Sequence, residues 1–319
     1  GPPNVLLNYD SSDTYQQGVN INDTLKFTDQ WMLRLGASQD WFRTNTFNNK
    51  SVQTGQFSSH GISPTGSIIF KPTLDSSVYA TYISSLQADS DVAPASTSTV
   101  TVVNSGASLA PYRSKQYEVG YKIDFDRINF TAALFDIDRP FANTFPVDGN
   151  PNRVIYEIVG DQINKGLELS AIGQVTQGLT VYGGLTLLTS KLENTPLAAT
   201  DGQPYVGTAK VKGNVLVEYH IPTLPGLVAT FDYQFSGPRP GDDTDQFSVA
   251  GYNLIDVGAR YTVKMWGTPV AWRLAVDNVA DRHYWSTIGP SNITGANTGN
   301  LVAHVGAPRT VDASVSVKF

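Results

Sequence analysis

The residues best suited to metal binding are few in this chain and widely spaced. There are four histidines, and none has the spacing that would place two of them on one metal ion: His60, His220, His283 and His304. The chain has no cysteine, so thiolate metal sites and disulfides are both excluded. Asp242, Asp243 and Asp245 lack the closing Glu of an Asp-rich calcium loop, and a solvated loop is the commoner interpretation. We therefore expect no metal ligands and no cofactor.

Motifs for catalysis are equally hard to find. The sequence contains no Gly-x-Ser-x-Gly elbow, no phosphate-binding loop and no His-Glu-x-x-His pair. Serine is plentiful, but no serine is placed with a histidine in a recognisable pattern. Binding or transport is therefore favoured over an enzymatic activity.

Charged residues inside extended segments are the remaining candidates. They alternate with apolar residues, so a strand would turn them to one face: Arg34, Asp40, Glu118, Lys122, Lys165, Glu168, Asp256, Arg260, Arg273 and Asp277. An Arg or Lys facing lipid at the membrane centre costs about 2–4 kcal/mol, so a membrane barrel would turn them inward. They could line a ligand path, but the commoner interpretation is a ladder of ion pairs that braces the wall.

The elements that must position these charges are strands. Period-two alternation recurs along the chain, as in 227–235, 255–263 and 270–276. The last eleven residues alternate without a fault and end on the aromatic Phe319. A soluble protein rarely ends on a long exposed strand of this kind, because an open edge invites aggregation. A bacterial outer-membrane barrel does, with one face toward lipid and one toward a polar lumen.

The connections between strands are of two kinds. Short turns are expected at 28–30, 72–75, 124–127, 176–178, 223–226 and 266–269. Long polar loops are expected at 88–113, 237–246 and 288–300. Short turns at one end and long loops at the other are typical of an antiparallel transmembrane β-barrel with short periplasmic turns and long extracellular loops.

Counting hairpin arms predicts about thirteen strands. With an odd count, the first and last strands run the same way and would close the barrel in parallel, whereas bacterial single-chain barrels are antiparallel with an even count. Either the count is wrong by one, or the chain is the C-terminal part of a larger barrel.

Composition agrees with this fold class. The chain has 319 residues and a net charge of -6, which leaves no basic footprint for nucleic acid. No stretch approaches the roughly 18 consecutive apolar residues of a membrane helix. The N-terminus carries no signal peptide, so either it was removed or the chain begins inside a longer protein.

Several segments resemble TonB-dependent siderophore receptors, in the expected order along nearly the whole chain. They are 22–31, 114–122, 164–170, 178–184, 276–285 and 306–319. The segment 276–285 is similar to the family's Asn-Leu-Phe-Asp-Arg-x-Tyr motif, with Val279 and Ala280 where Leu and Phe are usual.

This resemblance implies a barrel of about 22 strands filled by an N-terminal plug that contacts TonB. No plug is recognisable here, so residues 1–319 would be the C-terminal part of the barrel domain. The implied function is an outer-membrane receptor of a Gram-negative cell that binds a ferric siderophore and imports it with TonB-transmitted energy. The siderophore wraps its own iron, and the other expected partners are membrane lipid and the barrel-assembly machinery.

Aromatic residues divide into two groups. Those near strand ends are expected in the membrane-interface girdles: Phe27, Trp31, Phe70, Phe125, Tyr261 and Trp266 by the short turns, and Trp41, Phe42, Tyr284 and Trp285 toward the long loops. By the resemblance, aromatics in or beside the loops are candidate ligand contacts: Phe141, Phe145, Tyr156, Tyr205, Tyr284 and Trp285. Phe319 resembles the C-terminal signal that the assembly machinery reads.

Three alternatives stay open. A complete passive porin-like barrel of 12 or 14 strands would have an even count, and pairing of its first strand with its last would favour it. An outer-membrane protease or lipase would need a Ser or Asp set facing a His. A soluble adhesin-like β-protein would be extracted without detergent.

Overall fold

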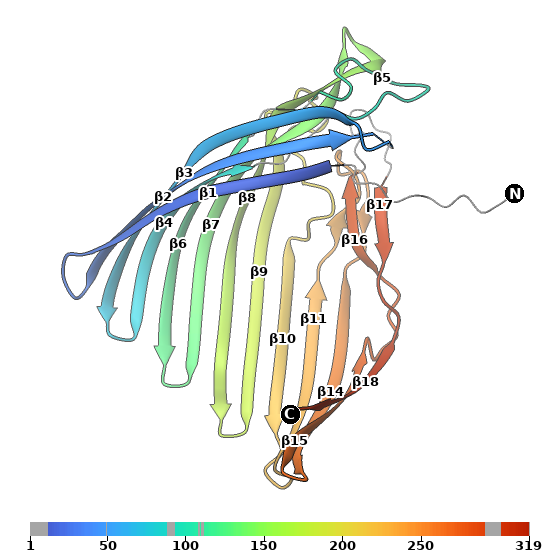
Figure 1. Cartoon of the computed structure of the whole chain (residues 1–319). Helices are drawn as coiled ribbons and strands as arrows, with labels where there is room; N and C mark the ends of the chain where they lie inside the picture. Colours follow the sequence, from blue (N-terminus) through green and yellow to red (C-terminus); the bar gives the residue numbers. More distant parts are fainter. Residues whose placement is uncertain are drawn as a thin grey trace, which may run out of the picture.

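The computed structural model describes residues 12–48, 50–87, 93–107, 109, 112–290 and 301–318, and within them the chain is built from β-strands (Figure 1). The strands are β1 (Ser12–Lys26), β2 (Trp31–Phe47), β3 (Gln53–Thr73), β4 (Ser76–Gln87), β5 (Thr101–Val102), β6 (Tyr112–Phe125), β7 (Ile128–Val147), β8 (Asn150–Thr176), β9 (Leu179–Glu193), β10 (Val211–His220), β11 (Leu227–Ser236), β12 (Arg239–Pro240), β13 (Ser248–Val249), β14 (Tyr252–Met265), β15 (Thr268–Asp277), β16 (Trp285–Pro290), β17 (Leu301–Val305) and β18 (Thr310–Val317). Among the described residues, no helix is long and apolar enough to cross a bilayer.

Thirteen strands form one curved sheet in which sequence neighbours are spatial neighbours. The order is β1-β2-β3-β4-β6-β7-β8-β9-β10-β11-β14-β15-β18, with β5 added as a parallel partner of β8. Every other pair in this sheet is antiparallel. The predicted count of about thirteen strands is therefore confirmed.

The sheet has two open edges. Within the described residues β1 pairs only with β2, and β18 pairs only with β15. Nearly every residue of these two strands is exposed. Both strands run toward the end of the sheet that holds the short turns (Figure 1). Antiparallel closure of the one on the other is therefore excluded by their direction.

All six short turns lie where the sequence predicts them, at one end of the sheet (Figure 1). The β14–β15 turn shows why so short a connection is possible. Trp266 and Gly267 both have positive φ, 50° and 82°, which suits a two-residue turn whose twist matches that of the strands.

The opposite end carries the long connections. Strands β7 and β8 have 20 and 27 residues, well beyond the roughly 9–11 needed to cross a membrane, so they extend past it. The expected loop at 288–300 is partly wrong, because 288–290 lie in the β16–β17 hairpin and 291–300 lie outside the described residues.

The two faces of the sheet differ in chemistry. Register places Val215, Phe231, Val257, Val276 and Val311 across neighbouring strands on one side, which we call the apolar face. Glu118, Glu168, Asp232 and Asp256 lie on the other side, the polar face. Large side chains on the apolar face are solvent-exposed over much of their surface, which suits contact with lipid.

Two residues do not face the way the sequence analysis expects. Lys165 is three positions from Glu168, and no bulge separates them, so the two side chains point to opposite faces. Lys165 therefore lies on the apolar side, where its Nζ is 3.0 Å from Asp136 Oδ2.

Phe42 is the second exception. It follows Trp41 directly in a strand, so the two side chains point to opposite faces and only one of them can lie on the apolar face. Trp41 is 45% exposed on the apolar face, whereas Phe42 is 8% exposed on the polar face. At the short-turn end, the rings of Trp31 and Phe70 pack 4.6 Å apart on the apolar face, and their place in a membrane-interface girdle stays a prediction.

Candidate ligand site on the polar face

The polar face is hollowed at three places along its wall. One cavity of about 430 Å³ is bordered by Tyr79, Glu118, Lys122, Glu168 and Lys212. A second, of about 510 Å³, is bordered by Glu218, Asp232, Asp256, Arg260, Arg273 and Asp277. A third, of about 250 Å³, lies at the long-loop end and is bordered by Lys212, Asn214, Ser236, Arg239, Tyr252 and Ser286.

Apart from Lys165, the charges expected on the polar face lie there, but they do not form the expected ladder of ion pairs. The four ion pairs among the described residues are Arg127–Asp126, Arg153–Asp148, Lys165–Asp136 and Arg309–Asp281. None of them joins two charges of the polar face.

Register explains why the ladder fails. Asp232 lies directly opposite Asp256, and Arg260 lies directly opposite Arg273. Like charges in such positions repel each other. The Gln234 amide donates to Asp232 at 3.0 Å and to Asp256 at 3.5 Å, which partly satisfies the acidic pair. Within the described residues, the wall therefore carries charges of both signs that are not joined in direct ion pairs.

Glu118 shows a different arrangement in the first cavity. Its carboxylate accepts from the Tyr79 hydroxyl at 2.6 Å and from the Gln116 amide at 3.0 Å. The Lys122 ammonium lies 5.1 Å from the centre of the Tyr79 ring. The Glu118 carboxylate is thus held by hydrogen bonds, and Lys122 contacts the Tyr79 ring instead of forming a direct ion pair with Glu118.

Arg239 organises the cavity at the long-loop end. Its guanidinium donates to the backbone carbonyls of Trp285 at 2.6 Å and Ser286 at 3.2 Å, which fastens β16 to the wall. It also lies 5.4 Å from the centre of the Tyr252 ring, an arrangement that attracts a cation to the aromatic face.

Asn278 connects the strands to this hairpin. With φ at 51°, it adopts the left-handed conformation that Asn tolerates well. Its N–H donates to Asp256 at 2.6 Å, its side-chain amide donates to the carbonyls of Arg282 and Ala307, and its side-chain oxygen accepts from the Arg282 N–H. The segment that leaves β15 is thus tied to the segment that enters β18.

Tyr284 is held by a partner ring and a close glycine. Its ring lies 4.5 Å from that of Tyr252, and Gly306 lies against its face so closely that a Cβ would come within 2.1 Å of the ring. Burial, with Tyr252 and Asp256 nearby, raises the pKa of the Tyr284 hydroxyl. It is therefore a neutral donor at ordinary pH.

The acidic loop near the cavity is ordered by Asp242. Its carboxylate accepts the N–H groups of Thr244, Gln246 and Phe247 and the Thr244 hydroxyl. Burial alone would raise the pKa of Asp242, but these donors outweigh it and hold the pKa below its usual value. The carboxylate serves the loop's own backbone.

The six candidate aromatic contacts do not gather at one place. Tyr284 and Trp285 belong to the Arg239 cavity through ring and backbone contacts. Burial raises the pKa of Tyr205, which lies near Arg139 and Tyr112. Tyr156 packs with Ala93, Val102 and Val154.

The other two candidates lie on β7. Phe141 lies against Gly160, and Phe145 is buried opposite Ile155. The ligand contacts of all six residues stay predictions, and Phe319 lies outside the described residues.

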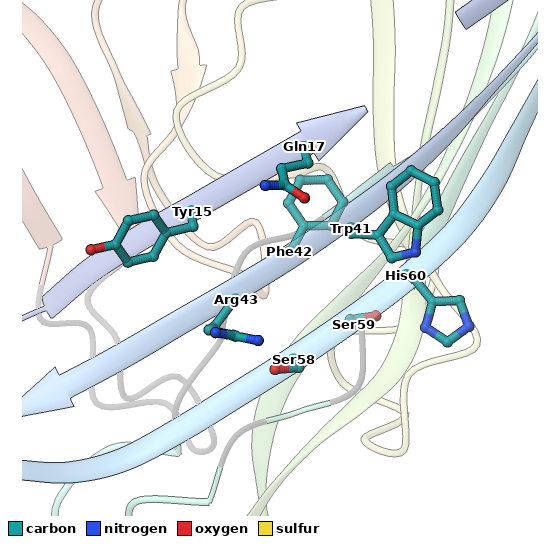
Figure 2. Close-up of a pocket in the computed structure, with 8 residues that line it drawn as sticks. All are labelled: Tyr15, Gln17, Trp41, Phe42, Arg43, Ser58, Ser59 and His60. Atoms are coloured by element: carbon teal, nitrogen blue, oxygen red, sulfur yellow. The ribbon is translucent and has the colours of Figure 1, made fainter. Parts of the chain in front are cut away.

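A further pocket, of about 370 Å³, lies where β1, β2 and β3 approach the long-loop end (Figure 2). Tyr15, Trp41, Arg43 and His60 come from neighbouring strands and occupy positions of the apolar face. Amphipathic rings beside a cation suit a membrane interface. This pocket therefore does not belong to the three cavities of the polar face.

No motif in the sequence marks Arg239, Lys212 or Tyr252 as a site residue. One available signal was Arg239 itself, a cation between two prolines in a long loop, where the restricted backbone holds the side chain in place. Lys212 and Tyr252 lie on strands β10 and β14, and only the order of the strands in the sheet shows that both border the same cavity.

The comparison with known families settles the class of protein. Residues 1–279 match the family described as TonB dependent receptor-like, beta-barrel. The chain belongs to the TonB-dependent receptor family. These receptors are outer-membrane proteins of Gram-negative bacteria, so the sheet is part of an outer-membrane barrel.

Individual TonB-dependent receptors cover the whole chain. It is 31% identical to the ferrichrome receptor FcuA of Yersinia enterocolitica, over 100% of this chain and 41% of that protein. It is 25% identical to the ferrioxamine receptor of the same species, over 99% of this chain and 42% of that protein. The chain thus spans about two fifths of these relatives.

Solved receptor structures agree in fold. The ferric preacinetobactin receptor BauA of Acinetobacter baumannii superposes with a TM-score of 0.76 at 28% identity, over 97% of this chain and 43% of BauA. The siderophore receptor PiuA of the same species gives 0.73 at 22% identity, over 95% of this chain and 43% of PiuA, which supports the fold alone.

Proposed function

We propose that this chain is the C-terminal part of a receptor barrel that binds a ferric siderophore at its extracellular end and imports it with energy transmitted by TonB. The observation that carries the proposal is the Arg239 cavity, a polar recess on the lumen side at the long-loop end. The relatives named for ferrichrome, ferrioxamine and ferric preacinetobactin support a siderophore as the ligand class.

In this proposal, binding and transport replace bond chemistry. The iron stays wrapped by the siderophore, so the protein needs no metal ligands and no cofactor. Among the described residues, no group of three or more His, Asp or Glu side chains is placed to hold a metal ion. The family is one of receptors and transporters, which favours this function over an enzymatic one.

We further propose that more strands and a plug complete the receptor. The open edges of β1 and β18, and the fraction of the relatives that is matched, support a larger barrel. The charges on the polar face suit contact with a plug, through which TonB would act. Outer-membrane lipid would contact the apolar face, and the barrel-assembly machinery would insert the chain.

A binding panel tests this function directly. The receptor, purified at full length in detergent, would be titrated with gallium complexes of hydroxamate, catecholate and citrate-type siderophores, using calorimetry. We expect one class to bind with a micromolar or lower dissociation constant, and its metal-free form to bind at least tenfold more weakly.

The contradicting result is a receptor that binds none of these complexes. Reconstituted in liposomes, it would then be tested for the permeation of small sugars. Free permeation would support the passive barrel of 12 or 14 strands.

A further inference from the structure

Among the described residues that border the cavity at the long-loop end of the polar face, two are cations and none is a carboxylate. Lys212 lies on β10, and Arg239 is the first residue of the short strand β12, which follows β11. The other polar groups on its border are amides and hydroxyls, among them Asn214, Ser236 and Ser286. All of these can donate a hydrogen bond, so the recess is a positively charged set of donors.

Arg239 is the unusual member of this set because it is buried without an anion. Only 3% of its surface is exposed. Two of its nitrogens donate to backbone carbonyls, while its Nε is buried without a hydrogen-bond partner. Among the described residues, no carboxylate lies within ion-pair distance of it. A guanidinium stays charged at any ordinary pH, so its charge remains uncompensated.

Acidic groups on the neighbouring strands and in the nearby loop have hydrogen-bond donors of their own. Asp232 and Asp256 accept from Gln234, and Asp256 also accepts from the backbone of Asn278. Buried charges in proteins are normally paired. Within the described part of the chain, neither the buried Arg239 nor Lys212 forms an ion pair, so the recess between them is suited to an anion that arrives from outside.

Close backbone contacts hold the walls of the recess together. Gly207, at φ 76°, approaches Ile288 so closely that a Cβ would meet its carbonyl at 2.0 Å. Its N–H donates to the carbonyl of Pro240 at 2.9 Å. Three parts of the chain thus meet here: the connection before β10, strand β12 and the β16–β17 hairpin.

We propose that this recess is a subsite for a carboxylate carried by the ferric siderophore outside its iron-coordinating groups. The inference rests on the proposed receptor function and narrows its ligand class. The carboxylate would lie between Arg239 and Lys212, while the Tyr252–Tyr284 ring pair borders the apolar part of the ligand. Arg239 would act both as a ligand contact and as the fastening of the hairpin.

The test compares two forms of one ligand on the full-length receptor. The probes are the gallium complex of a trihydroxamate that carries one free carboxylate, and the same complex with that group as a carboxamide. We expect calorimetry to give at least tenfold tighter binding of the acid by the wild-type receptor. Lys212→Gln should reduce this preference to threefold or less, with little change for the carboxamide.

Two further variants separate the ligand role from a structural one. Arg239→Gln should also lower the preference for the acid. Because this change also removes hydrogen bonds to the β16 backbone, the result with Lys212→Gln decides between a ligand role and a structural role. Lys264→Gln is the matched control. Lys264 lies on the polar face, as Lys212 does, but at the short-turn end of β14, so this variant should keep the wild-type preference for the acid.

Equal binding of acid and carboxamide by the wild type would overturn the subsite and leave the receptor function standing. So would a Lys212→Gln variant that binds both forms more weakly by the same factor. Failure of either complex to bind, when the siderophore panel also fails, would overturn the receptor function and the subsite together.

Discussion

The guanidinium of Arg239 donates to the backbone carbonyl of Trp285 at 2.6 Å, although 46 residues separate them in the sequence. This bond, together with the bond from Arg239 to Ser286, joins β12 to the β16–β17 hairpin. A backbone carbonyl is specified by position and not by side-chain type. The partnership therefore leaves no trace in the sequence of the hairpin.

Replacing Arg239 with Ala should release the hairpin. Bonds from a charged donor contribute about 1.5–3 kcal/mol each, so hydrogen exchange at the amides of β16 and β17 should accelerate by roughly tenfold or more. Arg260→Ala is the control, because Arg260 makes no such bond within the described residues. Unchanged exchange in the Arg239 variant would show that other contacts hold the hairpin.

Replacing Asn278 with Ala should destabilise the junction between β15 and β18. The change removes three side-chain hydrogen bonds, including those to the carbonyls of Arg282 and Ala307, a loss of roughly 3 kcal/mol. The folded barrel should lose heat resistance on a gel that separates folded from unfolded protein. Asn20→Ala, at an exposed position of β1, should change nothing; equal heat resistance of both variants would count against this role.

The assignment of the two faces predicts opposite effects of the same new charge. Leu274→Arg places a cation on the apolar face and should cost about 2–4 kcal/mol near the membrane centre. Thr230→Arg places it on the polar face, directly opposite Glu218, and should be tolerated. Urea unfolding in lipid vesicles measures both. A larger loss from Thr230→Arg would reverse the assignment.

Removing 317–319 should impair insertion into the outer membrane. Val317 pairs with Val270, so the deletion shortens the last strand and also removes the C-terminal aromatic that resembles an assembly signal. The amount of heat-modifiable barrel in the outer-membrane fraction is the measurement. A yield equal to that of the intact chain would reject the signal.

Much of the fold could be predicted from the sequence because period-two alternation and turn residues act locally. The strand count and the short turns follow from these signals. The faces predicted for Lys165 and Phe42 are wrong. A shift of one residue along a strand moves a side chain to the opposite face, and residue type alone does not determine the register.

The site was harder to predict because it depends on distant partners. Tyr284 meets Tyr252, and Arg239 meets the β16 backbone, only after the strands are set in order. The ion-pair ladder failed for the same reason, since the register places Asp232 opposite Asp256 and Arg260 opposite Arg273. The aromatic residues of the loops indicate only that a site lies at the long-loop end. The strand register determines which of them lie at the same cavity.

The most direct test is iron uptake by living cells. Gram-negative cells without their own siderophore receptors would express the full-length receptor and be given radioactive iron as the siderophore complex that binds best in the panel. We predict uptake that requires both the receptor and TonB and stops when the membrane potential is collapsed. Equal uptake by cells that lack TonB would contradict energised import and indicate a passive pore.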